Sequence, residues 1–222
     1  MNISSDQSKE KLRSVFHKAG IRVTPRQLNH LWIYYRLIET RNPEYDLTRI
    51  SGLTEIAVKH FIDCAMVSEM IELPQSLLDI GTGAGLPGIV LKIMNPCLSL
   101  ILAEPRPRRI AFLHEVVREL ALSEVEIHEQ KVTDEDSHFK VDGVITRALE
   151  TIDATLKRVG GIIPPGGRVV FMKGPAVDDE LTRLKKDSIR RFACIQDFSY
   201  LLPTTNHRRR LVVFQRRSGS LS

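Results

Sequence analysis

The feature that most constrains the fold of this chain is a hydrophobic segment that contains a carboxylate and runs directly into four glycines. The segment Leu77-Leu78-Asp79-Ile80 is followed by glycines at positions 81, 83, 85 and 88. Glycine adopts positive φ angles and allows a ligand to approach the bare backbone. The pattern therefore predicts a strand that enters a helix through a loop built to hold a nucleotide-like ligand.

Two kinds of ligand fit such a loop. The segment from Gly83 to Gly88 has the spacing of the dinucleotide fingerprint, with Glu104 nineteen residues beyond Gly85 as a possible ribose-binding acid. Asp79 argues against a dinucleotide, because an unpaired carboxylate repels a pyrophosphate. The same carboxylate attracts the sulfonium and ammonium groups of S-adenosyl-L-methionine. We therefore expect S-adenosyl-L-methionine as the cofactor, and a tight turn without any ligand is the remaining alternative.

Length and composition narrow the class of protein. With 222 residues, 42% of them hydrophobic, we expect one main domain with a small extension. No apolar run approaches the roughly 20 residues that span a bilayer, and no cationic leader is seen, so we expect a cytoplasmic protein without membrane contact. The three cysteines lie far apart without a CxxC pair, which argues against a metal site. Residues 190–222 carry seven Lys/Arg against one Asp/Glu, a composition typical of phosphate-binding surfaces and also of solvated termini.

The chain divides into a helical region, residues 1–73, and a region of alternating strands and helices, residues 74–222. Alternation predicts a mostly parallel sheet, and a closing hairpin would place one antiparallel strand in it, as in the Rossmann-like class I methyltransferase fold. The expected helices are Lys9–Ala19, Arg26–Glu39 after a Thr24-Pro25 cap, Leu53–Glu72, Pro87–Met94, Ile110–Leu122, Ile152–Val159 and Asp178–Lys186. The expected strands are Leu77–Ile80, Leu98–Ala103, Val125–Ile127, Val141–Thr146, Arg168–Met172, Cys194–Leu201 and Leu211–Gln215.

Several motifs, in this order, resemble those of the RsmG (GidB) family. They are Gly85-Leu86-Pro87-Gly88, the segments 109–113 and 142–148, Lys173-Gly174, and Arg209-Arg210 before the last strand. That family uses S-adenosyl-L-methionine to methylate N7 of one guanosine in 16S ribosomal RNA of the small ribosomal subunit. The resemblance implies the same activity and partner here, and it leaves the oligomeric state open, with a monomer expected.

The resemblance also implies a set of cofactor-binding residues. Two positions depart from the family pattern: Glu104 stands where Asp is more frequent, and Thr133 stands where Glu is more frequent, so Thr133 could contact the adenine through its backbone alone. Together with Asp79 from the loop argument, the cofactor-binding candidates are Asp79, Gly81, Gly83, Gly85, Leu86, Glu104, Val132, Thr133 and Arg147.

Arg147, at the end of the fourth strand, is the one catalytic candidate. Guanine N7 already exposes a lone pair, so its methylation needs positioning rather than a general base. An arginine bidentate to O6 and N7 would block the reacting atom. We therefore expect Arg147 to hold the cofactor, the guanine O6 or a phosphate, and a strand-end surface arginine is the alternative.

The candidates for RNA binding are basic or polar residues near the expected site. His60 and Asp63, three residues apart on one helix, could equally form a buried polar pair. Each arginine or lysine could equally be a solvated surface charge. The RNA-binding candidates are His60, Arg109, Lys173, Arg209 and Arg210, with Arg106, Arg108 and Arg208 as further phosphate contacts. Two other functions stay open: methylation of a small molecule or protein, and a non-catalytic RNA-binding module.

Overall fold

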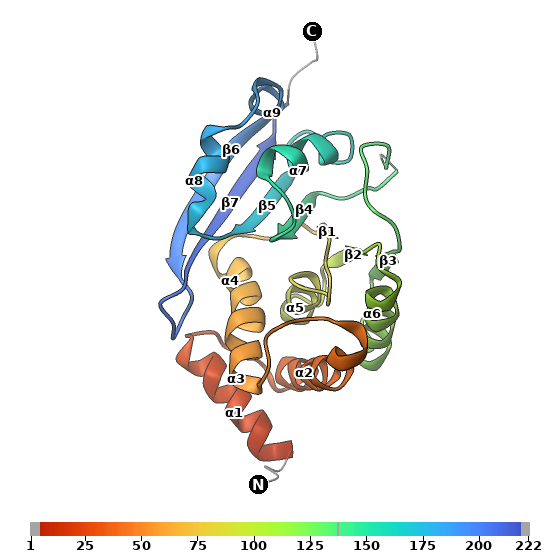
Figure 1. Cartoon of the computed structure of the whole chain (residues 1–222), viewed down its shortest axis with the longest axis vertical. Coiled ribbons are helices and arrows are strands. Elements are labelled where there is room, and N and C mark those ends of the chain that lie inside the picture. The colour runs from red at the N-terminus through yellow and green to blue at the C-terminus, as the bar shows by residue number, and fades with distance from the viewer. Residues whose placement is uncertain (1–4, 137, 219–222) are drawn as a thin grey trace.

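The computed structural model describes residues 5–136 and 138–218 and contains a seven-stranded sheet (Figure 1). The strands are β1 Ser76–Ile80, β2 Ser99–Ala103, β3 Val125–His128, β4 Gly143–Arg147, β5 Arg168–Lys173, β6 Phe192–Leu201 and β7 Arg208–Arg216. Their order in the sheet is β3-β2-β1-β4-β5-β7-β6. β1 to β5 pair in parallel, and β7 is antiparallel to both β5 and β6. The predicted single antiparallel strand is confirmed.

Helices precede the sheet and cover both of its faces. They are α1 Ser5–Lys18, α2 Pro25–Tyr45, α3 Leu53–Ile56, the π-helical segment η1 Ala57–Ile62, α4 Asp63–Met70, α5 Gly88–Met94, α6 Pro107–Glu119, α7 Ile152–Val159, the short 3-10 turn η2 Pro175–Val177, α8 Asp178–Thr182 and α9 Lys186–Arg191. None of the helices within the described residues is long and apolar enough to cross a membrane. The N-terminal helices lie at one end of the molecule and α9 at the other (Figure 1).

The start of α2 follows the sequence closely. The Thr24 side chain accepts from the Gln27 backbone, and the Gln27 side chain accepts from the Thr24 backbone, which forms a capping box. The helix ends at Tyr45, six residues later than predicted, because the Asn42 side chain accepts the amides of Leu47 and Thr48 and so builds the turn that stops it.

Apart from helices whose ends are shifted, two predicted helices differ from the structure within their length. The segment predicted as one helix over residues 53–72 is helical to Met70 but includes η1, a π-helical segment with wider turns. The helix predicted over residues 178–186 stops at Thr182, and a separate helix starts at Lys186. The second start is explained by Asp153, whose carboxylate accepts the Lys185 amide and the Ser188 hydroxyl.

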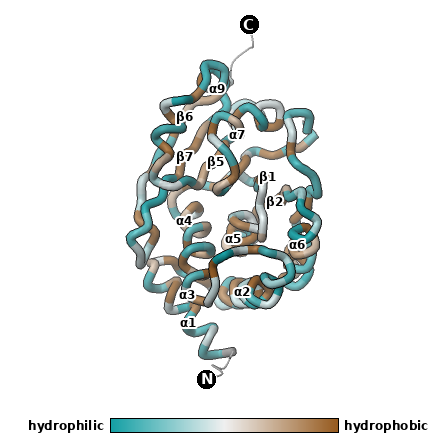
Figure 2. The backbone as a smooth tube through the Cα atoms, viewed as in Figure 1, coloured by the Kyte–Doolittle hydropathy of each residue, from teal (hydrophilic) through white to brown (hydrophobic). Residues whose placement is uncertain are grey.

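Alternate residues of the strands feed two hydrophobic cores, one on each face of the sheet. One core joins strand residues such as Leu77, Leu100 and Ile145 to the N-terminal helices, α5 and α6. The other joins residues such as Leu78 and Val144 to α7 and its neighbours. The interior is therefore hydrophobic on both sides of the sheet (Figure 2). The N-terminal helices share a continuous core with the sheet, and residues 71–75 connect α4 to β1.

Candidate active site

The glycine loop follows β1 and is tied to the end of β2. The amides of Gly81 and Thr82 both donate to the Ala103 carbonyl, at 2.9 and 3.2 Å. Gly81, Gly83 and Gly85 have φ angles of 68°, 62° and 94°. These left-handed conformations explain why glycine stands at the three positions. At Gly85 an added Cβ would point into the protein, where it would lie 2.5 Å from the Ile89 side chain.

Asp79 at the end of β1 holds this loop through hydrogen bonds. It is 1% exposed, and its Oδ2 accepts from the Thr82 hydroxyl at 2.6 Å and the Gly88 amide at 2.8 Å. Its other oxygen, Oδ1, has no hydrogen-bond partner among the described residues. Burial raises the pKa of Asp79 to about 6, opposed by the hydrogen bonds from Thr82 and Gly88. Asp79 thus shapes the loop and still holds one free acceptor next to it.

Glu104 lies at the end of β2, beside the loop. One carboxylate oxygen accepts the Gly83 amide and the other accepts the Arg106 amide, both at 3.0 Å. Arg109 lies next to this carboxylate, with Nη1 3.9 Å from Oε2, and its Nη2 donates to the Asp46 carbonyl at 3.3 Å. A carboxylate has about four acceptor positions, so two remain for ribose hydroxyls. Arg109 is therefore placed at the predicted cofactor pocket rather than on an outlying surface.

Val132 and Thr133, the predicted neighbours of the adenine, already have partners in the chain. The buried Val132 accepts at its carbonyl from Arg158 Nη1 at 2.7 Å. The Thr133 amide donates to the Asp136 carboxylate at 2.6 Å. A contact from the Thr133 amide to an adenine would therefore have to displace the Asp136 carboxylate. Leu86, the remaining loop candidate, is 8% exposed and packs into the core.

Arg147 ends β4 and reaches into η1. Its Nη2 lies 2.9 Å from His60 Nδ1, and its Nη1 lies 3.4 Å from Asp63 Oδ2. Nδ1 also lies 3.1 Å from the Lys59 carbonyl. A guanidinium can only donate, so we assign Nδ1 as the acceptor of the shorter contact to Arg147, with the proton on Nε2 facing the Thr48 hydroxyl at 2.8 Å. Burial, followed by the charge of Arg147, lowers the pKa of His60 to about 3. His60 is therefore neutral and fixes the direction of Arg147.

A hollow of about 310 Å³ lies over this network. Asp63, which is 4% exposed, also accepts from Arg209 Nε at 3.1 Å, so two guanidinium groups share one carboxylate. This cluster of three charged groups carries one net positive charge. The hollow is lined by Ile50, Lys59, His60, Asp63, Arg147, Ala148, Met172, Lys173, Gly174 and Arg209.

The other basic candidates are paired within the chain. Lys173 Nζ donates to the Glu150 carbonyl at 2.6 Å and to both oxygens of Glu180 at 3.1 and 2.9 Å. Arg210 makes a bidentate contact with Asp197 and a further ion pair with Asp178 at 3.0 Å. Lys173 and Arg210 are thus tied to carboxylates of their own chain. RNA binding by these residues, and by His60, Arg109 and Arg209, stays a prediction.

Sequence reasoning missed two residues that contact the loop. Leu149 is 42% exposed, and its Cδ1 would lie 2.5 Å from a Cβ added at Gly81. Ala148, with φ 52°, turns the chain so that Leu149 lies there. Tyr34 donates from its hydroxyl to the Ala84 carbonyl. An apolar residue two positions after Arg147 was an available signal for Leu149, whereas Tyr34 falls outside the predicted apolar stripe of its helix.

The loop has the features expected of an S-adenosyl-L-methionine site. Asp79 Oδ1 offers a buried acceptor for a cationic group, and a Cβ at Gly83 would fill the space up to Arg109 Nη1, 3.5 Å away. Glu104 retains acceptor positions for two hydroxyls. The residues therefore fit the cofactor. In the described part of the chain, three or more His, Cys, Asp or Glu side chains nowhere gather in a way that could hold a metal ion.

The sequence profile of the GidB family, described as rRNA small subunit methyltransferase G, matches residues 27–211. This chain belongs to that family. Ribosomal RNA small subunit methyltransferase G 2 of Syntrophobacter fumaroxidans is 40% identical over 209 residues, which cover 93% of this chain but only 41% of that longer protein. The protein of the same name from Bdellovibrio bacteriovorus is 39% identical, with 95% of this chain and 82% of the relative covered. The predicted family and the methyltransferase class of enzyme are confirmed.

Solved structures confirm the fold. MtNAS in complex with MTA and tNA superposes with a TM-score of 0.58 at 14% identity, covering 96% of this chain and 87% of that one. The fibrillarin/Nop5p complex gives a TM-score of 0.52 at 15% identity, covering 68% of this chain and 79% of that one. At such low identity the likeness concerns the fold alone, which is the predicted Rossmann-like fold.

Proposed function

We propose that this protein transfers a methyl group from S-adenosyl-L-methionine to N7 of a guanosine in 16S ribosomal RNA. The observation that carries the proposal is the family match over residues 27–211, which includes both the glycine loop and Arg147. The loop and the hollow lie next to each other, because Leu149, beside Gly81, is only two residues beyond Arg147. A methyl donor in the loop and a base in the hollow would therefore be neighbours.

The chemistry suits a site without a general base. When bound, S-adenosyl-L-methionine supplies an electrophilic methyl group. Asp79 Oδ1 would hold a cationic part of the cofactor, and Glu104 would accept from the ribose hydroxyls. Leu149 would exclude water from the space over Gly81. Since guanine N7 needs no deprotonation, the remaining task of the protein is to orient the base.

Arg147 is the residue that we propose orients the base. Hydrogen bonds to His60 and Asp63 hold its guanidinium at the floor of the hollow. Because the cluster with Asp63 and Arg209 keeps one net positive charge, it favours an electronegative group such as the guanine O6 or a phosphate. Contact to O6 alone leaves the N7 lone pair free for attack.

Exposed arginines near the site are the proposed contacts to the RNA backbone. Arg49 and Arg208 adjoin Ile50 and Arg209, which line the hollow, while Arg106 and Arg108 begin the helix after Glu104. The guanidinium groups of all four are exposed, and within the described residues none forms an ion pair or a hydrogen bond. They are therefore free for phosphates, unlike Lys173 and Arg210.

The test supplies methyl-labelled S-adenosyl-L-methionine to the protein with intact small subunits, with naked 16S ribosomal RNA, or with ribosomal proteins alone. Label in 16S ribosomal RNA from the first or second mixture supports the proposal. Arg147→Ala is the control, and we expect it to lose about 100-fold in turnover with its fold intact. Label in protein alone, or equal methyl turnover without RNA, would contradict the proposal, and absent cofactor binding would favour a non-catalytic module.

A further inference from the structure

The glycine loop is held from two sides of the molecule. From the sheet, the Ala103 carbonyl accepts the amides of Gly81 and Thr82, and the Glu104 carboxylate accepts that of Gly83. From the opposite side, the Tyr34 hydroxyl donates to the Ala84 carbonyl at 2.6 Å. Tyr34 belongs to α2, fifty residues earlier in the chain, so the N-terminal helices contribute directly to the geometry of the loop.

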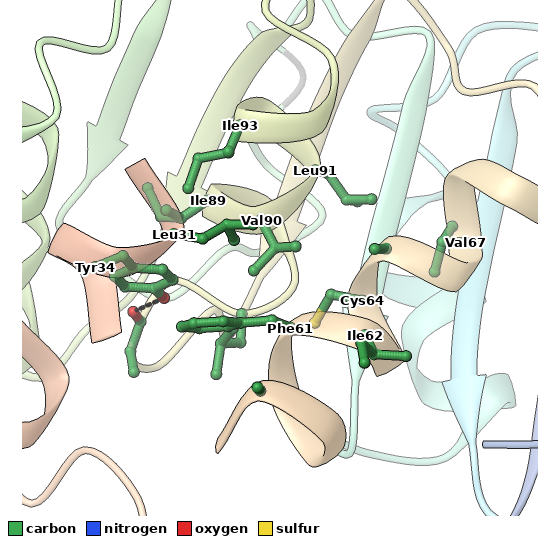
Figure 3. Packing of buried hydrophobic residues seen from close by; sticks show 14 of the residues in the cluster. Leu31, Tyr34, Phe61, Ile62, Cys64, Val67, Ile89, Val90, Leu91 and Ile93 are labelled. Atoms are coloured by element: carbon green, nitrogen blue, oxygen red, sulfur yellow. Dashed lines mark hydrogen bonds between the residues drawn. The ribbon is translucent and has the colours of Figure 1, made fainter. Parts of the chain in front are cut away.

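Tyr34 is itself fixed in place. It is fully buried, and its ring stacks on Phe61 with a centroid distance of 5.3 Å and an interplanar angle of 16°. Figure 3 shows the two rings against Ile89 and Val90 of α5, with the hydrogen bond of Tyr34 drawn as a dashed line. Burial raises the pKa of Tyr34 well above its ordinary value, so the hydroxyl stays protonated and acts as a donor.

The hydrogen bond acts on the peptide between Ala84 and Gly85, whose amide donates to the Thr82 carbonyl at 3.0 Å. Gly85 has a φ of 94°, a conformation that favours glycine. Glu104 fixes that stretch at the Gly83 amide, and Tyr34 fixes it at the Ala84 carbonyl. An added Cβ at Gly85 would lie 3.1 Å from the Tyr34 oxygen, which shows how closely the hydroxyl approaches the turn.

We propose that Tyr34 is a positioning residue for the cofactor, which holds the segment Gly83–Gly85 in its binding conformation before the cofactor arrives. The inference rests on the proposed function, because it takes the loop as the S-adenosyl-L-methionine site. Without the hydroxyl, this peptide is held only through the Gly85 amide, so its carbonyl end samples other orientations and binding has to select the correct one. The affinity then falls by the fraction of time that the loop is misplaced.

The same ring links the two parts of the site. Phe61, which stacks on Tyr34, lies next to His60 in η1, and His60 accepts the hydrogen bond from Arg147. The helical region therefore supports the loop through Tyr34 and the hollow through His60.

A pair of matched variants tests the inference. Tyr34→Phe removes only the hydroxyl that reaches the loop. Tyr35→Phe removes a hydroxyl from the next residue of the same helix, where it bonds to Glu39 and not to the loop. Calorimetric titration of S-adenosyl-L-methionine into each full-length protein, well below its melting temperature, should show about five- to tenfold weaker binding for Tyr34→Phe. Tyr35→Phe should stay within about twofold of the unaltered protein.

A purely structural role for Tyr34 predicts a different result, namely a lower melting temperature with an unchanged dissociation constant, and that result would overturn the inference. If Tyr34→Phe does not fold, fluorotyrosine at position 34 changes the hydroxyl acidity and keeps the shape. A changed affinity would then support the role of the hydroxyl, and an unchanged one would overturn it. Failure of the unaltered protein to bind S-adenosyl-L-methionine would instead refute the proposed function itself.

Discussion

Arg147 Nη2 donates a 2.9 Å hydrogen bond to Nδ1 of His60, and this contact joins the end of β4 to η1 beneath the hollow. His60 stays neutral because burial lowers its pKa to about 3. A neutral imidazole accepts at one nitrogen and donates at the other, so an Nδ1 that accepts from Arg147 leaves Nε2 to donate to the Thr48 hydroxyl on the far side. The orientation of the guanidinium therefore depends on His60 and its neighbours in the fold.

His60→Ala should lower kcat on small subunits by about 100-fold, because an unsupported Arg147 no longer orients the base. His60→Gln offers an amide oxygen to Arg147 and should restore part of the loss. Binding of S-adenosyl-L-methionine, measured by calorimetry, should change little in either variant. Normal turnover in His60→Ala would show that the hydrogen bond to Arg147 has no role in the reaction.

The affinity for S-adenosyl-L-methionine should decrease below pH 6. Burial raises the pKa of Asp79 to about 6, so the carboxyl becomes neutral below that pH and loses its attraction for a cationic group. The dissociation constant should then rise by up to about tenfold per pH unit. The stability effect of this group has the opposite sign: the folded state binds the proton more tightly, so the free energy of unfolding falls as the pH rises from about 4 to about 6.

Calorimetric titrations between pH 5 and pH 8, repeated with Asp79→Asn, measure this dependence. The variant should bind weakly at every pH, without the increase in affinity above pH 6. An affinity of the unaltered protein that is constant over this range would contradict the role given to Asp79 Oδ1.

Two glycine variants separate backbone strain from loss of the cofactor site. Gly83→Ala and Gly20→Ala both place a side chain on a left-handed residue, with φ of 62° and 76°. Each should lower the free energy of unfolding by about 1–2 kcal/mol. Only at Gly83 does the new methyl enter the loop, facing Arg109 Nη1 at 3.5 Å, whereas nothing lies within 4 Å at Gly20.

Binding of S-adenosyl-L-methionine should therefore be weakened strongly in Gly83→Ala and be retained in Gly20→Ala. Urea unfolding measures the shared stability cost, and calorimetry measures the affinities. Equal affinities of the two variants would mean that Gly83 is not in the binding site.

The exposed arginines should control how strongly RNA binding depends on salt. Arg49→Ala and Arg208→Ala should each reduce the slope of log affinity against log salt by about 1. Arg118→Ala is the control for loss of an exposed arginine outside the site: Arg118 lies on the last turn of α6, at the end of that helix away from the site, and pairs with Glu119 at 3.2 Å. Filter binding of 16S ribosomal RNA at several salt concentrations gives the slopes. An unchanged slope in Arg49→Ala and Arg208→Ala would place the RNA elsewhere.

The parts of the fold with a strong local signal could be predicted from the sequence. The β1 run into the glycines, the Thr24 cap and the closing hairpin all agree with the structure. The wide turns of η1 could not be predicted, because one irregular turn leaves the hydrophobic pattern of a helix almost unchanged.

The site was harder to predict, since its details depend on contacts between distant residues. The sequence indicated Asp79 and Arg147 as candidates, but it could not tell that Asp79 Oδ1 has no partner among the described residues or that His60 contacts Arg147. In the sequence, Lys173 cannot be distinguished from a free surface cation. Its ion pair with Glu180 is seen only in the folded structure. The contact of Tyr34 with the loop was not predicted for the same reason, because its partner Ala84 is fifty residues away in the chain.

The most direct measurement identifies the nucleoside that the protein makes. 16S ribosomal RNA from small subunits incubated with the protein and S-adenosyl-L-methionine is cleaved at N7-methylguanosine and digested for mass spectrometry. We predict N7-methylguanosine at one position of the RNA, and its loss when Arg147→Ala replaces the unaltered protein. Methyl groups on an exocyclic amino group or a ribose 2′-oxygen, with guanine N7 unmodified, would contradict the proposed reaction.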